Sequence, residues 1–252
     1  VIDRNVNGCA NLGYCGMGCP INVTDGCAKL LNNFGSEALK AKYLDGLTQT
    51  DMSRLTQGGQ FMTEKEGGSD VGTLTTRAVL EGDHWRLYGE KWFCSNADAK
   101  VVMLLARPEG AGPGTKGVGL FLMPRFLDDG SPNHYRIVRL KDKLGTRSMA
   151  SGEVRLEGAT AWLVGDPGAG FKQMADMVNN SRLSNAVRAA GMMRRAVFEA
   201  LFVARDFVAD GVFSRGIEGP ATVPGGVLYA VSYGRDGTIG QVHRQADGSG
   251  KA

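Results

Sequence analysis

The chain has 252 residues, 42% of them hydrophobic, which is enough for one large domain or two smaller ones with an ordinary core. Its 29 basic and 26 acidic residues leave a net charge of +3, too small to predict a nucleic-acid or polyanion partner. No apolar run reaches the roughly 18 residues of a membrane span, and no cleavable signal pattern is visible. We therefore expect a globular intracellular protein.

The five cysteines are an odd number, which argues against a complete disulfide framework and for a reducing compartment. Four of them, Cys9, Cys15, Cys19 and Cys27, lie close to the amino terminus. Their spacing matches none of the usual zinc pairs and no histidine lies nearby, so we expect small buried thiols and no metal site. The chain begins at Val1 in sequence typical of the middle of a domain, and we expect it to be a fragment.

Helical patterns come first along the chain. A helix is expected over 24–31, and a better-defined amphipathic helix over 36–44, with the Ser36 side chain capping its first turn. We expect Gly46 to end this second helix, because glycine is the usual residue just after a helix end.

Strand patterns dominate the middle of the chain, where β-branched and aromatic residues alternate with turn residues. The Gly-Asp turn within 81–83 predicts a hairpin. The expected strands are 73–80, 85–90, 91–96, 101–106, 117–123, 135–140 and 152–156. Strands so close together, with no helical crossover between them, predict an antiparallel barrel or sandwich. The glycine-rich piece at 110–114 superficially resembles a phosphate loop, but it lacks the Gly-Lys-Ser/Thr ending and a surface hairpin loop is favoured.

The pattern returns to helix after Gly168-Ala169-Gly170, first over 171–178 and then over 182–205. Five apolar residues recur at spacings of three, four and seven, which predicts a buried stripe on a bundle helix. They are Leu183, Val187, Ala190, Val197 and Leu201. Residues 211–252 hold ten glycines and no helical period, so we assign no regular structure to them.

The stretch 59–71 is the most unusual one, because hydroxyls, acids and paired glycines fall in one short run where the helical pattern gives way to strands. Backbone amides near Gly68 can approach a phosphate closely, and the hydroxyls of Thr63 and Ser69 can donate to ring carbonyls or phosphate oxygens. A cofactor with a polar ring edge and a pyrophosphate would suit this run. The alternative is a capped turn in which these side chains bond only to their own backbone.

Three segments carry a resemblance: MTEKEGGSDV at 62–71, GEKWFCSN at 89–96 and GDPGAGFK at 165–172. Together they resemble the acyl-CoA dehydrogenase family, and the first two are similar to its branch of adaptive-response (alkylation-protection) proteins and isovaleryl-CoA dehydrogenases. The resemblance covers roughly 20–205. It implies an α+β multidomain fold, with a helical amino-terminal part, a central antiparallel β-barrel and the start of a carboxy-terminal helical bundle.

The periodicities and the resemblance together predict four parts. They are a partial amino-terminal helical domain at 1–58, a central β-barrel that binds FAD at 59–165, the start of the helical bundle at 166–210, and an unmatched glycine-rich tail at 211–252. The resemblance places FAD between the barrel and the bundle.

Seven residues are implied to contact FAD. Gln60, Met62 and Thr63 line the flavin ring, Gly68 and Ser69 meet the ribityl-pyrophosphate arm, and Phe93 and Ser95 lie beside the reactive ring nitrogen. The family more often has Trp in place of Phe93 and Thr in place of Ser95, so an aromatic ring and a hydroxyl are both kept. A hydroxyl bonded to the flavin helps it to accept hydride, and an aromatic wall excludes water.

The implied reaction is the α,β-dehydrogenation of an acyl-CoA thioester by a carboxylate base and FAD, with an electron-transfer flavoprotein as acceptor and a homotetramer as the assembly. In most members the base lies in a segment that this chain does not contain. In isovaleryl and long-chain members it precedes an arginine, where this chain has Ser181 before Arg182. Serine cannot be the base, so we expect no catalytic carboxylate and an inactive fragment. Arg182 either orders the site or is a solvated helix arginine.

A second departure concerns Phe207, Asp210 and Gly211, where the family has an arginine and a Phe-Gly pair that reach FAD of a neighbouring subunit. The alternative function is a flavin-containing DNA-protective protein of the alkylation response with little dehydrogenase turnover, for which a basic carboxy-terminal domain would be diagnostic. The resemblance implies a cytoplasmic location, or the mitochondrial matrix in a eukaryote. No acyl chain length is predicted, because the acyl pocket would be lined largely by the absent bundle.

Overall fold

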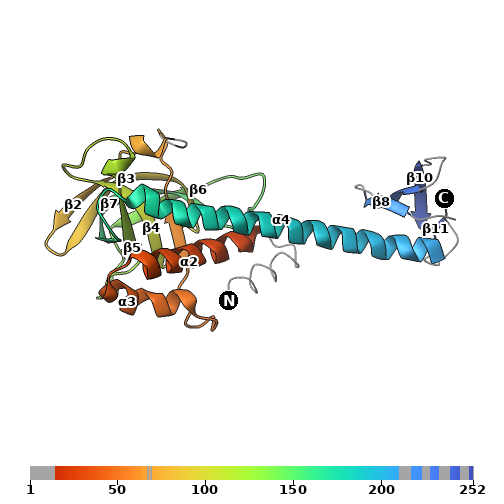
Figure 1. Cartoon of the computed structure of the whole chain (residues 1–252), viewed down its shortest axis with the longest axis horizontal. Helices are drawn as coiled ribbons and strands as arrows, with labels where there is room; N and C mark the ends of the chain where they lie inside the picture. Colours follow the sequence, from red (N-terminus) through yellow and green to blue (C-terminus); the bar gives the residue numbers. More distant parts are fainter. Residues whose placement is uncertain are drawn as a thin grey trace. The chain divides into compact units, whose positions relative to one another are not determined.

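The computed structural model describes residues 15–66, 68, 70–209, 217–222, 228–232, 239–244 and 250–251 (Figure 1). Side chains are described for residues 18–66, 68 and 70–202. Contacts divide the chain into two units, one ending at Arg188 and the other continuing from Ala189.

Two helices precede the barrel. Helix α2 (Cys15–Phe34) is longer than the predicted 24–31 at both ends, and α3 (Glu37–Thr48) follows it. The Ser36 side chain accepts a hydrogen bond from the backbone N–H of Leu39 at 3.3 Å, which confirms the predicted cap.

Gly46 does not end α3, so that expectation was wrong. The helix continues to Thr48, and the Gly46 carbonyl accepts a hydrogen bond from the backbone N–H of Thr56 at 2.9 Å. A Cβ on Gly46 would lie 2.6 Å from the Thr56 hydroxyl oxygen. The glycine therefore allows the following loop to pack against the helix.

Seven strands form the central sheet. They are β1 (Gly58–Phe61), β2 (Arg77–Glu81), β3 (His84–Ser95), β4 (Val101–Pro108), β5 (Gly119–Pro124), β6 (Tyr135–Leu140) and β7 (Ser151–Leu163). The predicted strands 85–90 and 91–96 are thus one strand. The order is β1-β3-β2-β4-β5-β7-β6, and a further β3–β7 pairing closes the sheet into a barrel.

The barrel is mixed in one respect. Most of its pairs are antiparallel, but β1 and β2 each pair with β4 in parallel. Two short 3-10 helices, η1 (Val71–Thr73) and η2 (Thr115–Gly117), lie in its connections. The predicted fold class is confirmed: amino-terminal helices, a central β-barrel and the beginning of a long helix.

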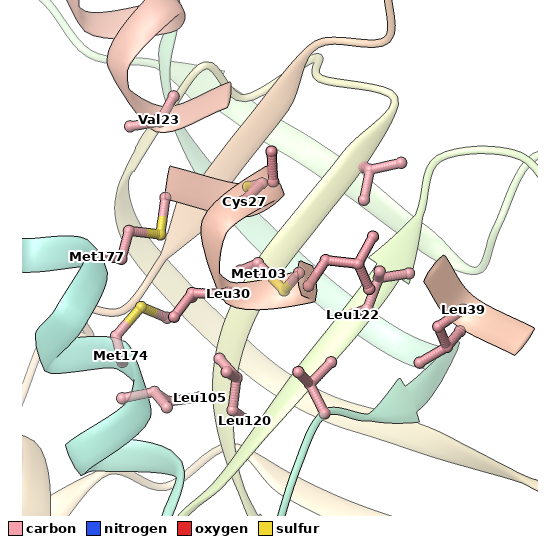
Figure 2. Close-up of a cluster of buried hydrophobic side chains, with 14 of the residues drawn as sticks. Val23, Cys27, Leu30, Leu39, Met103, Leu105, Leu120, Leu122, Met174 and Met177 are labelled. Atoms are coloured by element: carbon pink, nitrogen blue, oxygen red, sulfur yellow. The ribbon is translucent and has the colours of Figure 1, made fainter. Parts of the chain in front are cut away.

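Two hydrophobic clusters lie on opposite faces of the barrel wall. Along β4, Val102 and Leu104 face the barrel interior with Phe121, whereas Met103 and Leu105 face the helices. Both faces of β4 are buried, which explains its continuous apolar sequence. Figure 2 shows the outer cluster, in which α2 and the first turns of α4 (Gly170–Ala209) contribute side chains above strands β4 and β5. Its labelled members include Cys27, Leu30, Leu120, Leu122, Met174 and Met177.

Helix α4 is a single helix of 40 residues where two helical segments were expected. The predicted buried stripe was wrong: Leu183 is 65% exposed and Val187 is 39% exposed, and Ala190, Val197 and Leu201 are also exposed. The first turns of α4 instead bury Met174 and Met177 against α2 and the barrel. Helical spacing identifies an apolar face, but only a neighbouring element buries it, and within the unit that ends at Arg188 no described residue covers Leu183.

The unit that follows contains a second, four-stranded antiparallel sheet, in the order β11-β10-β9-β8. Its strands are β8 (Ile217–Thr222), β9 (Leu228–Ser232), β10 (Ile239–Arg244) and β11 (Gly250–Lys251). We had assigned no regular structure here, because these strands are short and the glycines between them break every longer period. Across the described ranges, no helix is long and apolar enough to span a membrane.

Candidate cofactor site

Gln60 and Ser95 lie opposite each other in the antiparallel pairing of β1 and β3. Both side chains are half-buried, and the Gln60 amide nitrogen donates to the sulfur of Met174 on α4 at 3.5 Å. Burial raises the pKa of the Cys19 thiol on α2, although the Arg188 charge and the nearby Ser95 side chain oppose the rise. Two motifs that are distant in sequence thus share one rim between the barrel and the helices.

Met62 and Thr63 continue this rim beyond the end of β1. Met62 is half-buried and packs against the outer hydrophobic cluster. The Thr63 carbonyl accepts a hydrogen bond from the backbone N–H of Trp92 at 2.8 Å. Within the part of the chain whose side chains are described, the Thr63 hydroxyl has no hydrogen-bond partner. This hydroxyl is therefore available as a donor to a ligand.

Phe93 is an aromatic residue held in an unusual backbone conformation. Its φ is 56°, in the left-handed region that bulky residues rarely adopt, and its side chain is 54% exposed. The β3–β7 register shifts between Lys91 and Cys94, so Phe93 lies in a β-bulge. The Lys141 ammonium lies 4.6 Å from the ring centroid. A strained bulge that presents an aromatic ring is typical of ligand sites.

The glycine turn has open space around Gly68, whereas Asp70 caps the 3-10 helix that follows it. Gly68 is exposed, and a Cβ built on it would meet only the Thr63 methyl carbon, at 4.0 Å. Ser69 lies outside the described residues. The Asp70 carboxylate accepts from the backbone N–H of Gly72 at 3.0 Å and caps η1. The capped-turn alternative is thus correct for Asp70. Among the described residues the Thr63 hydroxyl has no such bond, and Gly67 and Ser69 of the turn lie outside them.

Glu64 and Lys91 form a buried ion pair that sequence reasoning missed. The Lys91 ammonium lies 2.7 Å from a Glu64 carboxylate oxygen, and the two side chains are 0% and 3% exposed. Glu64 also accepts from Thr75, through its N–H at 2.6 Å and its hydroxyl at 2.8 Å, and from Thr76 through the same two groups at 3.1 and 2.5 Å. The only sequence signal was a lysine before two aromatic residues in a strand.

The charges of this pair follow from its surroundings. Burial alone would raise the pKa of Glu64, but the Lys91 ammonium and the hydrogen bonds from Lys91, Thr76 and Thr75 outweigh it and hold the pKa at about 2. Burial lowers the pKa of Lys91, and the Glu64 carboxylate opposes that shift. Glu64 is therefore a structural carboxylate engaged by five donors and is not available as a catalytic base.

Residues 59–159 match a known family, described as acyl-CoA dehydrogenase, middle domain. The chain belongs to the acyl-CoA dehydrogenase family. It is 40% identical over 200 residues to acyl-CoA dehydrogenase family member 11 of Caenorhabditis elegans, an alignment that covers 76% of this chain and 32% of the relative. It is 38% identical over 193 residues to AidB of Escherichia coli K12, covering 73% of this chain and 35% of AidB.

A solved structure shows the same relationship. The crystal structure of Caenorhabditis elegans ACDH-11 in complex with C11-CoA has 42% sequence identity and a TM-score of 0.66, and the match covers 71% of this chain and 32% of that one. The chain thus spans about a third of the length of these relatives.

Ser181, which departs from the family pattern, and Arg182, which matches it, both lie on the long helix α4. Ser181 lies between α4 and α2, where its hydroxyl accepts from the Asn22 side chain at 2.7 Å. Arg182 is exposed and donates a hydrogen bond to the Asn179 side chain at 3.4 Å. The Phe207 side chain, Asp210 and Gly211 lie outside the part of the chain that the structure describes.

The glycine-rich loop at 110–114 is a surface connection between β4 and β5, as expected. The Arg107 guanidinium donates to the carbonyls of Gly112 and Gly114, the latter at 3.2 Å, and to the carbonyl of Gly72 at 2.8 Å. Carbonyl oxygens converging on an arginine cannot bind a phosphate. The loop instead packs against η1, where Gly72 lies beside Gly114 and Thr115.

Cys27 and Cys94 are free, buried thiols. Burial raises the pKa of each to about 12, so neither is a reactive thiolate at neutral pH. Among the residues that the structure describes, no group of three or more His, Cys, Asp or Glu side chains is arranged to hold a metal ion.

Proposed function

We propose that the protein to which this chain belongs is an FAD-dependent acyl-CoA dehydrogenase. The observation that carries this proposal is the exposed ring of Phe93, held in a left-handed bulge on the strand that also places Ser95 opposite Gln60. Membership of the acyl-CoA dehydrogenase family supplies the reaction class.

The described rim residues fit a flavin. Phe93 offers an exposed aromatic ring, the Thr63 hydroxyl is an available donor, and Gly68 leaves open space for a phosphate-bearing arm. In the proposed complex, seven residues hold FAD in the three groups that the resemblance implies. They are Gln60, Met62 and Thr63 at the ring, Gly68 and Ser69 at the arm, and Phe93 and Ser95 beside the reactive nitrogen.

The chain's own groups would act by binding and exclusion. When bound, FAD supplies the acceptor for the hydride that leaves the β-carbon. The Thr63 hydroxyl donates a hydrogen bond to a ring heteroatom, which favours the electron-rich reduced state. The Phe93 ring excludes water from the ring edge. The α-proton requires a carboxylate base, which neither Ser181 nor the fully engaged Glu64 provides.

The substrate in this proposal is an acyl-CoA thioester, as the complex of ACDH-11 with C11-CoA suggests for a relative. The proposed base, the electron-transfer flavoprotein that receives the electrons, and the homotetramer all involve parts beyond the residues described. This chain alone is accordingly expected to bind flavin weakly and to show no turnover.

The test uses the complete reading frame that contains this chain. The purified protein is incubated with saturated acyl-CoAs of increasing length and a dye acceptor, and the thioesters are analysed by mass spectrometry. The proposal predicts bound FAD and a product that has lost two hydrogen atoms. A complete protein that contains no flavin, or that converts none of the acyl-CoAs, would refute it.

A further inference from the structure

The Glu64–Lys91 pair joins three segments that border the cofactor rim. Glu64 directly follows Thr63, and Lys91 precedes the bulge that presents Phe93. Thr75, the third contributor, lies beyond the glycine turn and η1. The Glu64 carboxylate therefore links the residues before the glycine turn to Thr75 after it, and links both to Lys91 on β3.

A backbone hydrogen bond acts beside this ion pair. The N–H of Trp92 donates to the carbonyl of Thr63 at 2.8 Å, so each residue of the ion pair adjoins a residue of the backbone bond. These two links set the separation between the end of β1 and the bulge of β3. The Thr63 hydroxyl and the Phe93 ring depend on that separation for their relative position.

Stability alone does not account for the pair. Desolvating two charges is costly, and replacing a buried ion pair with apolar residues of similar volume is often neutral or stabilising. What the pair does impose is geometry, because the Glu64 carboxylate must meet its five donors from fixed directions. Such specificity is useful where a binding rim must be held in one arrangement.

We propose that Glu64 and Lys91 are positioning residues that hold the turn at 63–68 and the bulge at Phe93 in register for cofactor binding. This inference rests on the proposed function. The pair is buried behind the rim and acts through Thr63 and Phe93, which are the residues that would touch the cofactor. Its loss is expected to loosen the rim and weaken FAD binding while the barrel remains folded.

The decisive variant is the double substitution Glu64→Gln with Lys91→Met, which removes both charges and keeps at position 64 an amide oxygen that can still accept from the Thr75 and Thr76 donors. The single variant Lys91→Met, which leaves an uncompensated buried carboxylate, is expected to be much less stable. The matched control is Arg86→Met on the same strand, which breaks an ion pair with Glu81 at 3.0 Å and a hydrogen bond to Thr160 at 2.8 Å.

Three measurements are made on each variant of the chain. They are the thermal unfolding temperature, amide hydrogen exchange by mass spectrometry on peptides covering 60–76 and 89–96, and the FAD dissociation constant by fluorescence titration. The double variant is expected to unfold at about the parent's temperature, to exchange at least tenfold faster in both peptides, and to bind FAD at least tenfold more weakly. Arg86→Met should leave the exchange rates and the FAD affinity within twofold of the parent.

Other outcomes are possible for the double variant and the parent. Exchange within twofold of the parent, or unchanged FAD affinity despite faster exchange, would overturn the inference. A double variant that does not fold would also count against it, because the pair would then serve stability. If the parent binds no FAD but exchange still rises, the proposed cofactor role of this chain fails and the structural link between the segments is supported.

Discussion

Gln60 on β1 lies directly opposite Ser95 on β3. This register brings the residues just before the glycine turn beside the residues just after the bulge, and so makes one rim from two separate motifs. Because Gln60 also contacts Met174, the rim lies where the barrel meets α4.

Thr63→Ala is predicted to weaken FAD binding by about fivefold, because it removes one hydrogen bond to the cofactor and a typical hydrogen bond contributes about 1 kcal/mol. The hydroxyl has no partner among the described side chains, so stability should change little. Fluorescence titration checks the affinity and thermal unfolding checks the stability. Thr48→Ala, at the end of α3, is the control and should leave FAD affinity unchanged. Equal affinity of Thr63→Ala and the parent would contradict the assignment.

Backbone strain at Phe93 predicts that Phe93→Gly is more stable than Phe93→Ala. Glycine adopts a φ of 56° without the penalty of about 1 kcal/mol that an L-residue pays there, and both substitutions remove the ring. Urea unfolding of the two variants measures the difference. Val138, an exposed residue of β6 without a positive φ, is the matched control, and there the order should reverse. A Gly variant at position 93 less stable than the Ala variant would show that no strain is stored.

The low pKa of Glu64 predicts a pH-dependent contribution to stability. Its pKa falls from the ordinary 4.5 to about 2 on folding, so its contribution is fully present above pH 4.5 and is lost as the pH falls toward 2. Glu64→Gln should therefore lower the free energy of unfolding by about 3 kcal/mol at neutral pH, since it leaves Lys91 unpaired. The deficit should shrink between pH 4.5 and pH 2.

Urea unfolding of Glu64→Gln and the parent across this pH range gives the difference directly. Glu37→Gln is the control, because the Glu37 side chain is 91% exposed and its pair with Lys40 lies on the surface. Its effect should stay small throughout. A deficit for Glu64→Gln that is the same at pH 7 and pH 3 would show that the carboxylate keeps its ordinary pKa.

The two faces of α4 should respond differently to truncation in this chain. Met174 is fully buried between α2 and the barrel, so Met174→Ala is predicted to cost about 2 kcal/mol or more of unfolding free energy. Leu183 is 65% exposed, so Leu183→Ala should change it by less than about 0.5 kcal/mol. Chemical denaturation of both variants measures these changes in unfolding free energy. A large loss for Leu183→Ala would mean that the helix face carrying Leu183 is covered in the folded chain.

Local signals were sufficient for much of the fold. The Ser36 cap, the hairpin turn between Glu81 and His84, and strand β6 all depend on neighbouring residues, and the sequence predicted them correctly. Features set by tertiary contacts were missed. The Gly46 position depends on Thr56, and the exposure of Leu183 depends on which elements surround α4.

The site residues stay a prediction. The clustered hydroxyls and glycines of 59–71 left a capped turn as the alternative, and only the resemblance to the acyl-CoA dehydrogenase family singled out Phe93 and Ser95; the structure places Ser95 opposite Gln60. The Glu64–Lys91 pair was not recognisable, since acids and lysines in a polar run are usually solvated and the bulge hides the inward direction of Lys91. The buried ion pair thus depends on tertiary contacts that no local pattern in the sequence reveals.

Flavin binding by the rim of Gln60, Thr63, Phe93 and Ser95 can be measured by calorimetric titration of the chain with FAD, with the double variant Thr63→Ala and Phe93→Ala as the comparison. We expect saturable binding of one FAD per chain and at least tenfold weaker binding by the double variant. Equal binding by both proteins, or no saturable binding by the parent, would show that the rim does not bind flavin.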